Sequence, residues 1–162
     1  MNTDIWPVIL FYGNVIIVVI VFLIMIDKSR LSELLPIGFF IAVENYTFEM
    51  LGLHFGYWSY PLDNPGYPEI IIISSLFYFP LIAMLFYQYL SKSIVKNILL
   101  IAGFVAYNMI IEIVTVTTTN IFLYKRNINL FMVLLIYISI YIIIIGFGYL
   151  YKKLITIGDR RM

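Results

Sequence analysis

Long apolar stretches separated by short polar segments dominate the pattern of this chain. A helix needs about 20 mainly apolar residues to cross roughly 30 Å of hydrocarbon, and five stretches meet that requirement. They run from about residue 7 to 26, 36 to 56, 70 to 90, 98 to 118 and 130 to 151. The pattern therefore predicts an all-α, polytopic membrane helix bundle of about five transmembrane helices, forming a single membrane domain over residues 1–162.

Prolines and charged residues refine the expected spans. Pro7 suits a first helical turn, and the charged turn from Asp27 to Arg30 ends the first span. No small-residue cleavage pattern follows Ile26, so we interpret this span as retained and not as a signal peptide. Pro80, near the middle of the third span, is expected to kink it and to free a backbone carbonyl. The fifth span is so rich in isoleucine that much of it should face lipid.

The distribution of lysine and arginine predicts the orientation of the spans. With the N-terminus outside, eight of the ten basic residues lie on the inner side and two on the outer side. Because cytoplasmic loops carry the excess of positive charge, the N-terminus is predicted outside and the C-terminus inside, in a multi-pass protein of the cell membrane. The aromatic loop 54–69 then lies outside, at the level where aromatic belts form.

Composition agrees with this assignment and excludes several kinds of site. Hydrophobic residues make up 63% and charged residues 12% of the chain, against about 45–50% and about 25% in soluble domains. The net charge of +1, without a long basic or acidic run, excludes a nucleic-acid binder. The absence of cysteine and the single histidine, His54, exclude disulfides, thiolate chemistry and a multi-histidine metal site. We expect no metal and no cofactor, and the lipid bilayer as the first partner.

Polar residues inside two of the spans are the most informative anomaly. The second span carries Glu44, Asn45 and Glu49, the fourth carries Asn108 and Glu112, and neither contains a basic residue. An ionised side chain at the centre of a membrane costs about 2.5–3.5 kcal/mol on insertion scales. Such residues normally face the interior of a bundle or a wet cavity, so they indicate a site.

The spacing of these residues predicts that they converge. Asn45 and Glu49 are four residues apart, as are Asn108 and Glu112, so each pair lies on one helical face. The two acids fall at similar depth in the outer half of helices that run in the same direction, and could meet across a shared cavity. Glu44 lies about 140° round the helix from Glu49, and its role stays open.

Two interpretations of this polar set compete. In the first, Glu49 and Glu112 form a site; without a bound cation one of them would stay neutral and able to donate a proton, whereas a bound cation would keep both ionised. In the second, the polar residues only join helices, although such hydrogen bonds contribute about 0.6 kcal/mol on average. We favour a site for the two acids, and both roles stay open for the two asparagines. Gly52 and Gly56 continue the first polar stripe and predict a close helix approach.

Two segments of the chain resemble a known family. The segment from Glu49 to Pro61 reads acid, then Gly-x-x-x-Gly-x-Trp-x-Tyr-Pro, and the segment from Phe79 to Tyr89 contains Met-Leu-x-x-Gln-Tyr. Together with Glu112 they resemble a family of small, uncharacterised multi-pass membrane proteins of spore-forming Gram-positive bacteria. The resemblance covers most of spans two to four and implies no activity; Ile113 stands where the family has a proline. It singles out as candidate site residues Glu49, Trp58, Tyr60, Gln88 and Glu112.

A fainter similarity links the aromatic loop to the small membrane cyclases of carotenoid and meroterpenoid pathways. Trp58, Tyr60, Pro68 and Glu69 look like the Trp-x-Tyr and Pro-Glu arrangement of those enzymes. The second acid of the carotenoid enzymes is missing, because Ile70 follows Glu69. For His54, for all the aromatic residues of this loop and for Gln88, anchoring at the membrane interface is the simpler interpretation, and ligand contact stays open.

Three functions remain open from the sequence. The first is an enzyme or binding protein for an amphiphilic or isoprenoid-like molecule, with Glu49 or Glu112 as a catalytic general acid. The second is a proton- or cation-linked carrier or channel component, which at five helices would require a homo-oligomer. The third is a non-catalytic accessory or immunity-type membrane subunit. Under the first, the candidate ligand contacts are Asn45, Asn108, His54, Trp58, Tyr60 and Gln88.

Overall fold

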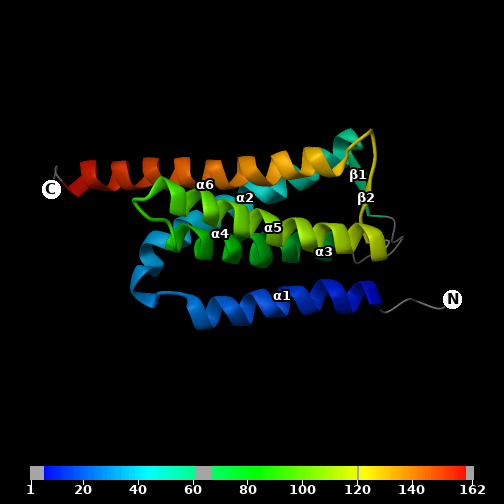
Figure 1. Cartoon of the computed structure of the whole chain (residues 1–162), viewed down its shortest axis with the longest axis horizontal. Coiled ribbons are helices and arrows are strands. Elements are labelled where there is room, and N and C mark those ends of the chain that lie inside the picture. Colours follow the sequence, from blue (N-terminus) through cyan, green and yellow to red (C-terminus); the bar gives the residue numbers. More distant parts are fainter. Residues whose placement is uncertain (1–5, 61–66, 120, 160–162) are drawn as a thin grey trace.

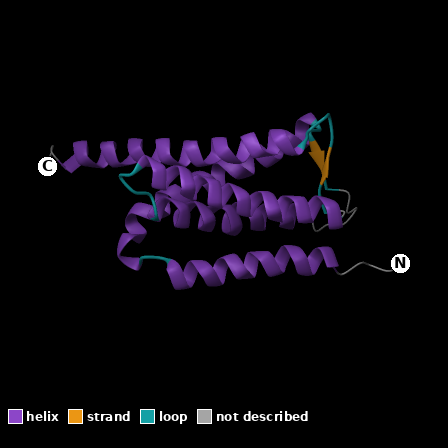
Figure 2. Cartoon of the chain, viewed as in Figure 1, coloured by secondary structure: helices purple, strands orange, loops and turns teal. Residues whose placement is uncertain are grey.

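The protein is an all-α helical bundle, as the sequence predicts (Figure 2). The computed structural model describes residues 6–60, 67–119 and 121–159. One strand pair accompanies the helices in these ranges. In chain order the elements are α1 (Trp6–Met25), the 3₁₀ turn η1 (Lys28–Arg30), α2 (Leu31–Phe55), β1 (Trp58–Ser59), α3 (Tyr67–Ile73), the π-helical turn η2 (Ser74–Tyr78), α4 (Phe79–Gln88), α5 (Ile94–Thr118), β2 (Leu123–Tyr124) and α6 (Leu130–Asp159).

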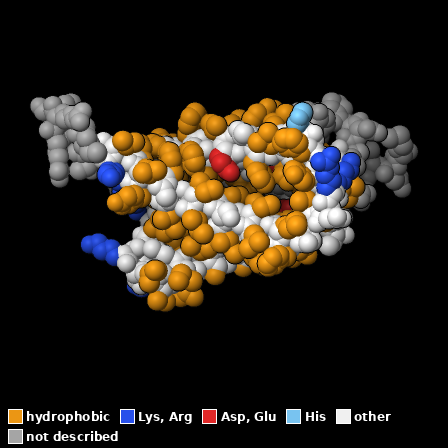
Figure 3. Space-filling model, turned by 90° about the horizontal axis from the view of Figure 1, so that it is seen from above, with side chains coloured by type: hydrophobic (Ala, Val, Ile, Leu, Met, Phe, Trp, Pro, Cys, Tyr) orange, Lys and Arg blue, Asp and Glu red, His pale blue; other side chains and the backbone are white. Residues whose placement is uncertain are grey.

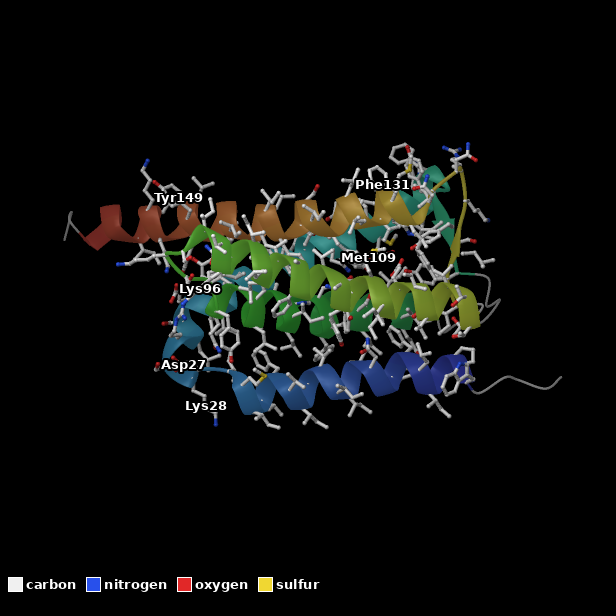
Figure 4. The ribbon with its side chains drawn as sticks, in the orientation of Figure 1. Asp27, Lys28, Lys96, Met109, Phe131 and Tyr149 are labelled. Atoms are coloured by element: carbon white, nitrogen blue, oxygen red, sulfur yellow. The ribbon has the colours of Figure 1, made fainter. Side chains whose placement is uncertain are left out.

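The helices lie side by side along the long axis of the molecule (Figure 1). Since α3, η2 and α4 follow one another without a gap, they form one rod, and α4 packs most extensively against α2. At one end, called the strand end here, β1 and β2 pair antiparallel, with Trp58 opposite Tyr124. The other end, called the Asp27 end, carries Asp27 and Lys96, as labelled in Figure 4. α1 begins at the strand end and α6 finishes at the Asp27 end.

Four segments of the described chain are long and apolar enough to cross a membrane. They are Lys28–Phe55, Glu69–Gln88, Ile94–Thr118 and Leu130–Ile155, and α1 adds a shorter apolar stretch, Ile9–Met25. Large apolar side chains are exposed on these helices, and hydrophobic atoms cover much of the surface between basic clusters at the ends (Figure 3). The fold is consistent with a multi-pass membrane protein, because water would not solvate such a surface.

Several helices extend beyond the predicted spans. α2 begins at Leu31 and includes Pro36, where the sequence predicted a start, and α6 continues to Asp159. α5 begins at Ile94, where the Ser93 hydroxyl accepts a hydrogen bond from the Lys96 N–H. Hydropathy locates the part of a helix that suits hydrocarbon, whereas capping determines where the helix itself begins.

The expected distortion at Pro80 takes the form of a π-helical turn. Pro80 has no N–H to donate, and η2 lies immediately before α4. The N–H of Phe79 donates to the carbonyl of Ser74, five residues earlier. This wider turn places the side chains of Ser74 and Ser75, both buried, next to α2.

Candidate functional site

A cavity of about 150 Å³ lies between the helices toward the strand end. Residues from α1, α2, η2, α5 and α6, together with the strand pair, form its walls. Most of the lining is apolar or aromatic, including Phe48, Trp58, Phe122 and Tyr137. This is enough space for a few water molecules or one small head group.

Glu49 projects from α2 into this cavity. Tyr60 directly follows β1, and its hydroxyl donates a hydrogen bond of 2.9 Å to Glu49 Oε2. The indole N–H of Trp58 makes no hydrogen bond of good geometry but lies close enough to interact with the Glu49 carboxyl. The segment after α2 therefore folds back over the helix and supplies the Tyr60 hydroxyl as a donor to the acid eleven residues earlier.

Glu112 reaches the same cavity from α5. Tyr124 of β2 donates to its Oε1 at 2.5 Å, and Tyr137 of α6 donates to its Oε2 at 3.1 Å. Both carboxyl oxygens thus accept hydrogen bonds from phenols. Since these donors come from two different elements, the side chain of Glu112 is held in one orientation.

The two acids are brought together as the sequence predicts. Glu49 and Glu112 both line the cavity and interact electrostatically across it. Among the described residues, no lysine, arginine or histidine lines this cavity. The site therefore has two carboxyl groups, several phenolic donors and no counter-charge of its own.

The phenols that hold the acids stay protonated. Burial, and then the nearby Glu49 carboxyl, raise the pKa of the Tyr60 hydroxyl well above its ordinary value. Burial and the Glu112 carboxyl likewise raise the pKa of Tyr124. Both hydroxyls consequently remain protonated at neutral pH and can act as hydrogen-bond donors.

Asn108 lines the inner part of the cavity and is almost completely buried. Its Oδ1 accepts a hydrogen bond from the Tyr78 hydroxyl at 3.2 Å, and its Nδ2 donates to the Tyr141 hydroxyl at 2.6 Å. The network joins η2, α5 and α6. The side chain therefore connects helices, although it also contributes to the cavity wall.

Asn45 has a similar position on the opposite helix. It lines the cavity from α2, and its Nδ2 donates to Ser75 Oγ at 2.9 Å. Ser75 is fully buried in the π-helical turn. Both asparagines of the two Asn-x-x-x-Glu units thus bind neighbouring helices on the inner side of the acids.

Trp58 is a closely packed aromatic residue of the site. Its side chain is 6% exposed and lies against Gly52 of α2, where a side chain would overlap the indole ring. The predicted close approach at Gly52 therefore accommodates this indole and not another helix. Gly56, the other glycine of that stripe, ends α2 in the left-handed conformation, with φ of 67°.

Three polar candidates lie outside the cavity. His54 is exposed near the strand end and packs edge-on against Phe55, as an interfacial anchor does. Glu44 is partly exposed on α2 and is absent from the described lining. Gln88 lies at the Asp27 end, so the structure does not bring it to the acids.

Gln88 has a structural position at that opposite end. Its Oε1 accepts a hydrogen bond from the Asp27 N–H at 2.7 Å, and its Nε2 donates to the Met25 carbonyl at 2.9 Å. Arg30 in turn donates to the Gln88 carbonyl at 2.8 Å. The side chain thus joins the end of α4 to the connection between α1 and α2.

Hydrogen bonds from Ser29 lower the pKa of the neighbouring Asp27 carboxyl.

Sequence reasoning missed two of the three phenols that bind the acids. Tyr124 lies in the loop before α6, and only the basic residues of that loop supported a prediction, which was the orientation of the spans. Tyr137 lies in the isoleucine-rich fifth span. A signal for Tyr137 does exist in the sequence. Four residues along α6, spaced three or four apart, form the buried stripe of that helix: Val133, Tyr137, Tyr141 and Ile144.

The arrangement suits binding better than metal coordination. The described residues contain no group of three histidine, cysteine or acidic side chains that could hold a metal ion. Two carboxyls beside aromatic rings are chemically able to attract an organic cation, through the acids and through the ring faces. No family model, curated protein or solved structure matches the chain. The assignment of a function therefore depends on this geometry.

Proposed function

We propose that this protein binds a small amphiphilic molecule with a cationic head group, and that Glu49 and Glu112 hold that head group. We further propose that it does so as a multi-pass protein of the cell membrane, with the strand end on the outer side. The acids would act as ligand contacts, and Trp58 and Tyr60 would form the aromatic part of the same site.

One observation carries this proposal. Two carboxyl groups, one from α2 and one from α5, line the same cavity. The described residues that line this cavity include no basic side chain to neutralise them. Carboxyl groups are expensive to bury in a membrane, so a cavity that contains two of them favours a positively charged occupant. The aromatic lining adds the ring faces that recognise ammonium groups in other proteins.

The carrier alternative has less support. The cavity ends on its inner side at the Asn108 network, beyond which lie packed apolar side chains such as Phe86, Leu34 and Ile37. These three residues are fully buried, and they lie between the network and the Asp27 end. A transport function would require this core to open, whereas binding requires no such change.

Native mass spectrometry of the detergent-purified protein tests the proposal. The wild-type chain should retain a small molecule, and Glu49→Gln and Glu112→Gln should each lower its occupancy at least tenfold, because the amide cannot supply the negative charge. Glu44→Gln is the matched control, since Glu44 lies on the same helix but outside the described cavity lining. A wild-type protein without any retained molecule, or equal retention in all four proteins, would contradict the proposal.

A further inference from the structure

A second hollow lies on the outside of the bundle at the strand end. It has a volume of about 560 Å³ and lies between the end of α5 and the start of α6. Its walls include Ile113 and Val116 of α5 and Leu130 and Phe131 of α6. Phe131, labelled in Figure 4 near the strand end of α6, is 66% exposed. We call this hollow the α5–α6 groove.

The groove and the acid cavity share a wall. Tyr124 and Ile128 line both spaces. The hydroxyl of Tyr124 donates to Glu112 inside the cavity, while the same residue contributes to the groove. A molecule whose head group lies beside Glu112 is therefore separated from the groove by little more than the Tyr124 side chain.

The groove is suited to hydrocarbon. Three of its lining residues have polar side chains: Thr117 Oγ1 donates to the Ile113 carbonyl at 2.6 Å, Asn129 Oδ1 accepts from the Met132 N–H at 3.0 Å, and the Tyr124 hydroxyl donates to Glu112. The remaining lining from α5 and α6 is apolar. An alkyl chain in the groove therefore faces mainly apolar side chains, which favours its burial there.

We infer that the α5–α6 groove holds the hydrocarbon chain of the same ligand whose cationic head group lies between Glu49 and Glu112. This inference rests on the proposed function and names the class of ligand: a single-chain amphiphile that enters from the outer leaflet between α5 and α6. The chain would pass beside the Tyr124 side chain, which lines both spaces. The two spaces adjoin along Tyr124 and Ile128, and this adjacency distinguishes the chain from the lipids that cover the other faces.

A photoreactive probe tests the inference on the whole protein in neutral lipid nanodiscs. The probe is an alkyltrimethylammonium with a diazirine at the end of its chain, and tetramethylammonium is the chainless competitor, with its own binding measured by calorimetry. Labelling should concentrate on peptides that contain the end of α5 and the start of α6. Excess tetramethylammonium should reduce it at least tenfold, because the competitor takes the head-group site.

Two tryptophan substitutions on α5 provide the variant and its control. Val116→Trp fills the groove and should reduce groove labelling at least tenfold while leaving the affinity for tetramethylammonium within about threefold of wild type. Ile110→Trp places the same bulk at an exposed position of α5, about one turn before Ile113, that lines neither space, and should label as wild type does. Circular dichroism of both variants shows that each is folded.

The outcomes separate the inference from the proposed function. If tetramethylammonium binds and depends on Glu112, but labelling is spread over all lipid-facing helices or resists competition, the groove inference is wrong and the proposed function stands. If tetramethylammonium does not bind the wild-type protein, both are wrong. Equal loss of labelling in Val116→Trp and Ile110→Trp would also overturn the inference.

Discussion

Gly52→Ala is expected to destabilise the protein by about 1–3 kcal/mol and to reduce ligand retention at least tenfold. The added methyl group would overlap the indole of Trp58, which is buried and lines the acid cavity. Overpacking of this kind typically costs about 1–3 kcal/mol. Since β1 and β2 pair at Trp58 and Tyr124, displacement of the indole should also disturb the phenol that holds Glu112.

The free energy of unfolding can be measured by titration with a denaturing detergent, with tryptophan fluorescence as the signal. Gly103→Ala is the control, because a methyl group added at Gly103 of α5 meets no atom within 4 Å. It should leave ligand retention unchanged and raise helix stability by up to about 1 kcal/mol. If both alanine variants behave alike, the packing of Trp58 on Gly52 does not determine the shape of the site.

Asn108→Leu is expected to lower the free energy of unfolding by about 1–3 kcal/mol. The substitution removes the partner of the Tyr78 and Tyr141 hydroxyls, both of which belong to buried side chains. Hydrogen bonds between membrane helices contribute about 0.6 kcal/mol each on average, and an unpaired buried hydroxyl adds its own desolvation cost. The same detergent titration measures this effect.

The triple variant that combines Asn108→Leu with Tyr78→Phe and Tyr141→Phe distinguishes the two roles considered for this asparagine. If Asn108 only joins helices, removal of both hydroxyls should restore most of the lost stability, because no buried polar group is left unpaired. The triple variant should also retain the ligand. Restored stability without ligand retention would show that Asn108 contacts the ligand directly.

The sequence was sufficient for the helices and for the pair of acids, because both depend on local patterns. Apolar stretches of sufficient length predict membrane-crossing helices, and the four-residue spacing places Asn45 with Glu49 and Asn108 with Glu112. Both acids do line one cavity in the structure. Their role in binding remains a proposal.

Tyr124 could not be predicted as a donor to Glu112, because the strand pair that positions it is a long-range contact. Trp58 lies opposite Tyr124 in the strand pair, and these residues come from connections separated by two helices and a loop. Hydropathy carries no information about such a pairing in a loop. Gly52 illustrates the same limit, since its neighbour is an indole from the following loop and not a second helix.

Gln88 shows that a resemblance can single out a residue that lies far from the acids. It entered the candidate set through a resemblance in sequence, yet its side chain bonds to the connection between α1 and α2. A polar residue at a helix end often satisfies backbone groups left free by neighbouring helices. Only the three-dimensional arrangement shows which of these groups it reaches.

The central claim is that Glu49 and Glu112 face one another across a single cavity. Because the chain contains no cysteine, a pair of introduced cysteines would be its only thiols. In the Glu49→Cys and Glu112→Cys double variant, a short bifunctional methanethiosulfonate should bridge the two thiols. The intact mass of each chain, measured by mass spectrometry, should then increase by one linker. In the matched Glu44→Cys and Glu112→Cys variant it should add as two separate linkers. Failure to bridge the first pair, or equal bridging of both, would contradict the account.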